Sequence, residues 1–144
     1  MQDNPKFSPP NPLSSDSFHK GFKRAYRLNN EAKELGFYWV FAEQILTQIS
    51  SEIQEVRQVL EQKESVGRVA EEIGDLLHGV VELCYFLNLN PELILESSLN
   101  KFEKRFTIMK KLMTKRGLET LKGKTPEALS LWQEAKKAGA AGED

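Results

Sequence analysis

This sequence of 144 residues has little cysteine, almost no net charge and no long apolar run. Its one cysteine, Cys84, excludes an internal disulfide, and its apolar neighbours indicate a small buried hydrophobic residue rather than a reactive thiol. No apolar stretch approaches the roughly 20 residues that span a bilayer. The first residues also lack the apolar core of a signal peptide. The expected location is therefore the reducing cytoplasm.

The net charge is close to zero, but the charged residues are unevenly distributed along the chain. The net charge is −1 and no continuous basic tract exists, which argues against a dedicated nucleic-acid binder. Residues 43–96 nevertheless carry eleven acidic residues against three basic ones, whereas residues 101–124 carry nine basic residues against two acidic ones. Adjacent acidic and basic segments of this kind can hold cations and anions respectively.

The periodicity of apolar residues predicts an all-α fold. Four of the six prolines fall within the first 12 residues, so residues 1–16 are expected to be a flexible leader. Beyond it, apolar residues recur every three or four positions, and strand-like alternation is absent. The predicted helices cover about 17–35, 40–62, 69–87, 91–116 and a last segment from 125. We expect one domain, residues 17–137, forming an antiparallel bundle of four to five helices, followed by a flexible tail at 138–144.

Two pairs of carboxylates suggest a metal site. Glu52 and Glu55 lie three residues apart on the second predicted helix, and Glu72 and Asp75 repeat this spacing on the third. If the two helices are antiparallel, the pairs can meet. Clustered carboxylates resist ionisation unless a cation is present, and hard divalent ions prefer oxygen ligands. Mg²⁺ is the leading candidate, with Mn²⁺ as a substitute. Each pair taken alone is more typical of a solvated helix face than of a metal site.

The basic segment offers the complementary half of a phosphate site. Lys101 and Arg105 lie four residues apart beside Phe102 and Phe106, so both can project from the edge of a buried face. A lysine ammonium and an arginine guanidinium both suit phosphate oxygens. A solvated cationic face near a helix C-terminus remains the alternative interpretation.

Five blocks in this order resemble one family. They are Gly36-Phe37-Tyr38-Trp39, Ser51-Glu52-Ile53-Gln54-Glu55-Val56, Glu71-Glu72-Ile73-Gly74-Asp75-Leu76-Leu77, Asn100-Lys101-Phe102-Glu103-Lys104-Arg105-Phe106 and Leu131-Trp132-Gln133-Glu134-Ala135-Lys136. Over roughly residues 25–137 the chain resembles the MazG nucleoside triphosphate pyrophosphohydrolases, most closely the C-terminal catalytic domain of the two-domain bacterial enzymes.

The resemblance implies an all-α enzyme that uses magnesium to cleave a nucleoside triphosphate into the monophosphate and pyrophosphate. It also implies a homodimer or a higher homo-oligomer, whose subunits complete the bundle. Matched by position, the catalytic metal ligands would be Glu52, Glu55, Glu72 and Asp75. Residues matching phosphate contacts are Arg68, Lys101 and Arg105, and those matching nucleotide contacts are Trp132 and Lys136. For Trp132, a role as a core anchor is an equally good interpretation.

Two departures from the family pattern leave an alternative open. Ser51 stands where the family usually has a first glutamate, and Glu82 stands where relatives tend to have asparagine. A nucleotide-binding or scaffolding relative with weakened catalysis would explain both. A di-iron bundle is a third interpretation, but it needs a Glu-x-x-His on each of two helices, and the chain has only His19 and His78.

Overall fold

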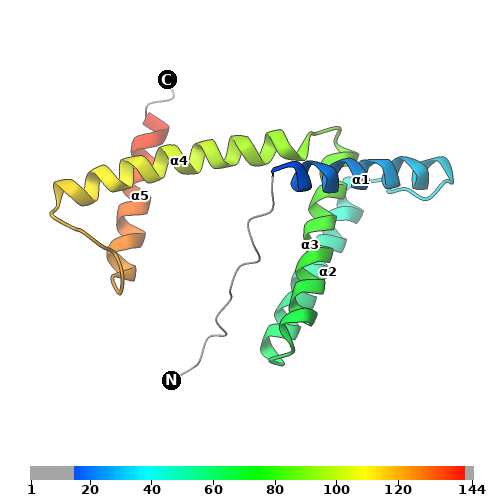
Figure 1. Cartoon of the computed structure of the whole chain (residues 1–144), viewed down its shortest axis with the longest axis horizontal. Coiled ribbons are helices and arrows are strands. Elements are labelled where there is room, and N and C mark those ends of the chain that lie inside the picture. Colours follow the sequence, from blue (N-terminus) through cyan, green and yellow to red (C-terminus); the bar gives the residue numbers. More distant parts are fainter. Residues whose placement is uncertain (1–14, 142–144) are drawn as a thin grey trace. The chain divides into compact units, whose positions relative to one another are not determined.

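The computed structural model describes residues 15–141, and over that range it contains five helices and no strand. The helices are α1 (Ser15–Glu34), α2 (Ala42–Glu61), α3 (Val66–Phe86), α4 (Pro91–Lys115) and α5 (Thr125–Ala141) (Figure 1). The prediction of an all-α fold is confirmed, and each helix matches its predicted range to within a few residues.

Several sequence predictions concern the ends of the chain. Most of the predicted leader lies outside the described residues, as do the last three residues of the predicted tail, whereas residues 138–141 belong to α5. None of the five helices is both long enough and apolar enough to cross a membrane. The cytoplasmic location stays a prediction.

The chain divides into two compact units, and the single domain expected over residues 17–137 stays a prediction. The first unit ends at Glu92 and holds α1, α2 and α3, and the second begins at Leu93 and holds nearly all of α4 together with α5. Each unit is described separately below.

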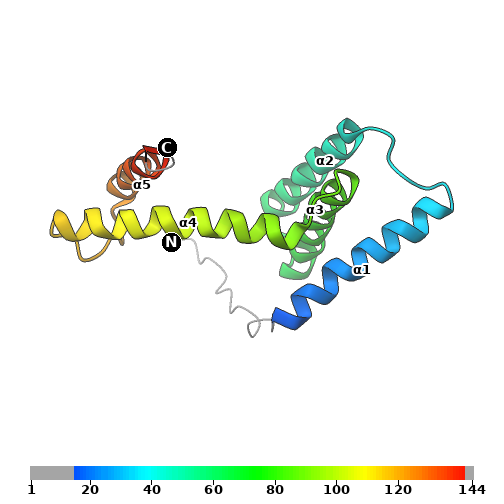
Figure 2. The same cartoon turned by 90° about the horizontal axis from the view of Figure 1, so that it is seen from above.

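In the first unit, α2 and α3 form an antiparallel pair joined by residues 62–65 (Figures 1 and 2). Ile45 and Val59 of α2 and Val81 and Cys84 of α3 are buried. Gly79 permits close approach, because a Cβ built there would lie 3.1 Å from Cγ1 of Ile49. The predicted burial of Cys84 is confirmed, and this burial raises the pKa of its thiol.

Local hydrogen bonds fix the ends of these helices. Oε1 of Gln44 accepts hydrogen bonds from the backbone N–H groups of Val40 and Phe41, which anchors the chain where α2 begins. Ser65 caps α3 by accepting from the backbone N–H of Arg68. The side chain of Asn90 accepts from the N–H of Glu92 in the first turn of α4.

Helix α1 crosses the pair near the C-terminal end of α3. The rings of Tyr26 and Tyr85 meet edge to face, with centroids 5.2 Å apart. The Tyr26 hydroxyl donates to the carbonyl of Leu89, and the Tyr85 hydroxyl donates to Oδ1 of Asn30 at 2.6 Å. Burial raises the pKa of Tyr26. These polar contacts hold α1 on α3 and shape the pockets described below.

In the second unit, α4 and α5 pack around Met109, Leu131 and Ala135. Arg116 near the end of α4 pairs with Glu134 of α5 through two hydrogen bonds of 2.7 and 3.0 Å. Both helices therefore contribute to a small apolar core, and an ion pair lies at its edge.

Candidate metal and nucleotide site

Three carboxylates meet between α2 and α3. One oxygen each from Glu52, Glu72 and Asp75 lies within 4.8 Å of the other two. Glu72 is buried, Glu52 is half-buried and Asp75 is exposed, so the group opens toward solvent on one side. The antiparallel pairing produces this arrangement because it brings the middle of α2 beside the first half of α3.

The donor set fits a hard divalent ion. Two oxygens bound to one ion are separated by at most twice the metal–oxygen distance, which is about 2.0–2.1 Å for Mg²⁺ and about 2.3–2.6 Å for Ca²⁺. The 4.8 Å span of this group lies within the limit of about 5.2 Å for Ca²⁺ and about 0.6 Å beyond the limit of about 4.2 Å for Mg²⁺. Three carboxylates also leave coordination positions for water and phosphate oxygens.

Glu55, the fourth predicted ligand, is exposed and is not part of this group. Its neighbour Glu52 is instead held by Gln48, whose Nε2 donates to Oε1 of Glu52 at 2.5 Å. Of the first predicted pair, only Glu52 belongs to the group. Of the second pair, both Glu72 and Asp75 belong to it.

Arg68 lies beside the carboxylate group. Its guanidinium donates to Glu71 and Glu72, and its Nε lies 3.4 Å from a carboxylate oxygen of Glu64. The hydrogen bonds to Glu71 and Glu72 raise the pKa of Arg68. The predicted phosphate contact is thus a cation at the edge of the candidate metal site.

The other predicted substrate contacts lie in the second unit. Lys101 is exposed, and Arg105, Trp132 and Lys136 are partly buried. Phe102, next to Lys101, contacts Trp132 with ring centroids 5.3 Å apart, so α4 and α5 bring these two parts of the predicted set together. Trp132 also packs against the buried core of this unit. This packing agrees with the core-anchor interpretation of Trp132, and its contact with a nucleotide stays a prediction.

The two departures from the family pattern lie in different surroundings. Ser51 is exposed on α2 beside Glu52. Glu82 lies outside the carboxylate group and accepts a hydrogen bond from Nε1 of Trp39 at 3.3 Å, while Nε2 of His78 lies 3.8 Å from its other oxygen. This link was not predicted from the sequence, although Trp39 belongs to the block Gly36-Phe37-Tyr38-Trp39.

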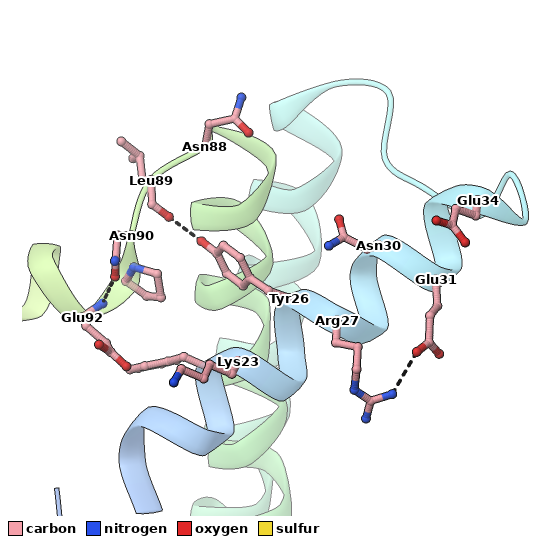
Figure 3. Close-up of a pocket in the computed structure, with 12 residues that line it drawn as sticks. Lys23, Tyr26, Arg27, Asn30, Glu31, Glu34, Asn88, Leu89, Asn90 and Glu92 are labelled. Carbon is pink, nitrogen blue, oxygen red and sulfur yellow. Dashed lines mark hydrogen bonds and ion pairs between the residues drawn. The ribbon is translucent and has the colours of Figure 1, made fainter. Parts of the chain in front are cut away.

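Two pockets occur in the first unit. One, of about 690 Å³, lies between α1, residues 37–40 and the C-terminal end of α3, and it contains Trp39 and Glu82. The other, of about 710 Å³, lies between α1 and the connection from α3 to α4 (Figure 3). Figure 3 shows Arg27 paired with Glu31 at 2.8 Å on its wall. This second pocket contains none of the predicted site residues.

Comparison with known proteins supports the sequence resemblance. The chain is 33% identical over 112 residues to a Thermotoga maritima protein named "Nucleoside triphosphate pyrophosphohydrolase/pyrophosphatase MazG". It is 29% identical over 117 residues to the Escherichia coli K12 protein named "Nucleoside triphosphate pyrophosphohydrolase". The alignments cover 78% and 79% of this chain. The resemblance to MazG-type proteins is thereby confirmed.

The MazG-like region is shorter than these relatives. The chain spans 42% of the T. maritima protein and 44% of the E. coli protein. No family model matches the chain. The alignments nevertheless cover about four fifths of the chain, which is enough to include both the carboxylates of the first unit and basic residues of the second.

Proposed function

We propose that this chain is a metal-dependent nucleoside triphosphate pyrophosphohydrolase, which cleaves a nucleoside triphosphate into the monophosphate and pyrophosphate. The observation that carries the proposal is the meeting of Glu52, Glu72 and Asp75 between two antiparallel helices. The names of the MazG relatives support the same reaction. A group of three carboxylates with one open side is suited to holding a cation against a polyphosphate.

The carboxylates would hold Mg²⁺, or Mn²⁺ in its place. When bound, such an ion neutralises phosphate charge and lowers the pKa of a water molecule that can attack phosphorus. Glu52 is positioned for this role by Gln48, and Glu72 by its burial and its contact with Arg68. Glu55 is a weaker candidate ligand because its side chain is exposed outside the group.

Cationic side chains would stabilise the phosphates and the leaving pyrophosphate. Arg68 stands next to the carboxylates, and its guanidinium can turn from Glu71 toward a phosphate oxygen. Lys101 and Arg105 would add charge from α4. Trp132 and Lys136 on α5 would contact the nucleotide.

We also infer that the protein forms a homodimer. Large apolar side chains between α1 and α2 are highly exposed, including Leu35 at 88%, Phe37 at 82% and Phe41 at 66%. Several large apolar side chains exposed within one short segment are typical of an interaction site. Light scattering coupled to gel filtration should give a mass twice that of the 16.4 kDa chain. A monomer at all concentrations would contradict the inference.

A pyrophosphate-release screen tests the proposed activity. The 144-residue chain is incubated with standard and modified nucleoside triphosphates, with Mg²⁺ or Mn²⁺, and with chelator as the blank. We expect pyrophosphate from at least one nucleotide, its loss on chelation, and a decrease of at least about a hundredfold in Asp75→Asn. Glu61→Gln, which makes the same kind of change at an exposed carboxylate of α2, should retain activity. Release from no nucleotide would refute the proposal.

Nucleotide binding without turnover is the second candidate function, and Ser51 favours it. This exposed serine stands beside Glu52, where the family usually has a further carboxylate. Calorimetry showing magnesium-dependent nucleotide binding, in a protein that releases no pyrophosphate, would support this alternative. Recovery of pyrophosphate release in Ser51→Glu would then locate the defect at this position.

A further inference from the structure

The pocket that contains Trp39 and Glu82 has the size and lining of a small-molecule site. Its volume is about 690 Å³, within the usual range for ligand pockets. Residues 37–40 supply aromatic walls, α1 supplies Asn29 and Asn30, and α3 supplies Glu82 and Tyr85. This combination of flat rings with a few polar groups suits a planar heterocycle.

The aromatic side of the pocket can stack on a ring. Tyr38 is 60% exposed and Trp39 36%, so their rings retain open surface. Trp39 is also fixed in orientation, because its Nε1 donates to Glu82. Aromatic side chains stack on any nucleobase, since every base has a π-face. The rings therefore favour a base but do not select which one.

The polar side of the pocket offers an acceptor and a donor. The side chain of Glu82 is only 22% exposed, and its carboxylate can accept further hydrogen bonds. Nδ2 of Asn29 is buried and has no hydrogen-bond partner among the described residues. A buried donor without a partner is costly, so a ligand acceptor at this point would be favourable.

A polar strip joins the pocket to the carboxylate group. Glu82 follows Asp75 by seven residues on α3, which places the two on the same face about 10 Å apart along the axis. On α2, Gln44 lines the pocket. Gln48 follows one turn later and donates a hydrogen bond to Glu52 of the carboxylate group. A nucleotide with its base in the pocket would extend its phosphates along this strip toward the carboxylates.

We propose that this pocket binds the base of a guanine nucleotide. Glu82 would accept from N1–H and the 2-amino group of guanine, and Nδ2 of Asn29 would donate to O6. A carboxylate has two acceptor oxygens and no donor when ionised, so it prefers two adjacent donors. Guanine presents such a pair, whereas adenine and cytosine place an acceptor nitrogen beside their amino group. The proposal rests on the proposed function, of which it names the substrate class.

Calorimetry with nucleoside monophosphates and no metal tests this assignment. Inosine monophosphate differs from guanosine monophosphate only in lacking the 2-amino group. We expect wild-type protein to bind the guanine nucleotide about tenfold to a hundredfold more tightly than the inosine and adenine nucleotides. Glu82→Gln should abolish this discrimination, and Glu61→Gln should preserve it. Equal affinities in the wild type would overturn the proposal without depending on any variant.

The two tryptophans of the chain give a second readout of the pocket. Guanosine monophosphate should quench tryptophan fluorescence in wild type, and Trp39→Phe should remove the part of that quenching that comes from the pocket. Quenching of the same absolute size in Trp39→Phe would refute the proposal.

Failure of this inference is distinguishable from failure of the proposed function. Pyrophosphate release without any preference for guanine would leave the hydrolase standing and remove the base assignment. Guanine binding that depends on Glu82, in a protein that hydrolyses nothing, would support the base assignment and refute the hydrolase.

Discussion

Arg68 donates a hydrogen bond to Glu72, and Glu72 is the buried member of the carboxylate group that includes Glu52 and Asp75. The protein thus supplies a cation of its own at the candidate metal site. A divalent ion bound there would share Glu72 with Arg68. The net charge at this site therefore depends on both the Arg68 guanidinium and the bound ion.

Replacing Arg68 by alanine should make the protein more dependent on metal. Without the guanidinium, Glu72 stays buried beside two other carboxylates, so repulsion lowers the stability of the metal-free protein. We expect a melting temperature a few degrees below that of wild type in chelator, and a larger rise on adding Mg²⁺. Thermal unfolding followed by circular dichroism measures both. Arg57→Ala, at an exposed position of α2, is the control, and identical behaviour of the two variants would contradict the prediction.

Glutamine substitutions at Glu52 and Glu55 should differ in their effect on catalysis. Glu52 belongs to the carboxylate group, whereas Glu55 is exposed outside it. If the group holds the catalytic ion, Glu52→Gln should lower kcat/KM by about a hundredfold or more, and Glu55→Gln by less than about tenfold. Steady-state pyrophosphate release at saturating Mg²⁺ distinguishes them. Equal losses would show that Glu55 moves into the site when substrate binds.

The helices and their apolar faces were predictable from the sequence because a 3.6-residue period has a direct signature. Asn90-Pro91 and Thr125-Pro126 marked helix starts that the structure confirms within a residue. The proximity of Glu72 to Glu52 could be predicted only if α2 and α3 were assumed to be antiparallel. A short connection made that condition reasonable, and the structure satisfies it.

Other features depend on contacts that no local pattern encodes. The exposure of Glu55 depends on the rotation of α2 about its axis, which the packing of Ile45 and Val59 determines. The hydrogen bond from Trp39 to Glu82 joins residues 43 positions apart, and it exists because α1 and the following loop fold over the end of α3. The division of the chain after Glu92 also could not be predicted, because the helical periodicity of apolar residues continues through both units.

Cys84 should react slowly with thiol reagents in the native protein. Burial raises the pKa of its thiol, so less thiolate is present at a given pH, and the buried sulfur is also hard to reach. Because the folded pKa is raised, the stabilising contribution of the neutral thiol is complete below the ordinary thiol pKa of about 8.5 and declines as the pH rises above it. Alkylation at pH 8 followed by mass spectrometry should show little native labelling and rapid labelling in urea. Equal rates would contradict the burial of this residue.

Alanine substitutions at Gly79 and Gly74 should change stability in opposite directions, although both glycines lie inside α3. A Cβ at position 79 would lie 3.1 Å from Cγ1 of Ile49, so in Gly79→Ala the Ile49 side chain must shift by a few tenths of an ångström. Overpacking of this kind costs about 1–3 kcal/mol, and the better helix propensity of alanine returns about 1 kcal/mol. We expect Gly79→Ala to lower the free energy of unfolding by about 1 kcal/mol.

Gly74 is the matched control because a Cβ there meets no atom within 4 Å. Only the helix propensity changes, so Gly74→Ala should raise the free energy of unfolding by about 0.5–1 kcal/mol. Urea unfolding curves with a common m-value would measure both effects on the same helix. A Gly79→Ala variant as stable as Gly74→Ala would contradict a tight contact between Gly79 and Ile49.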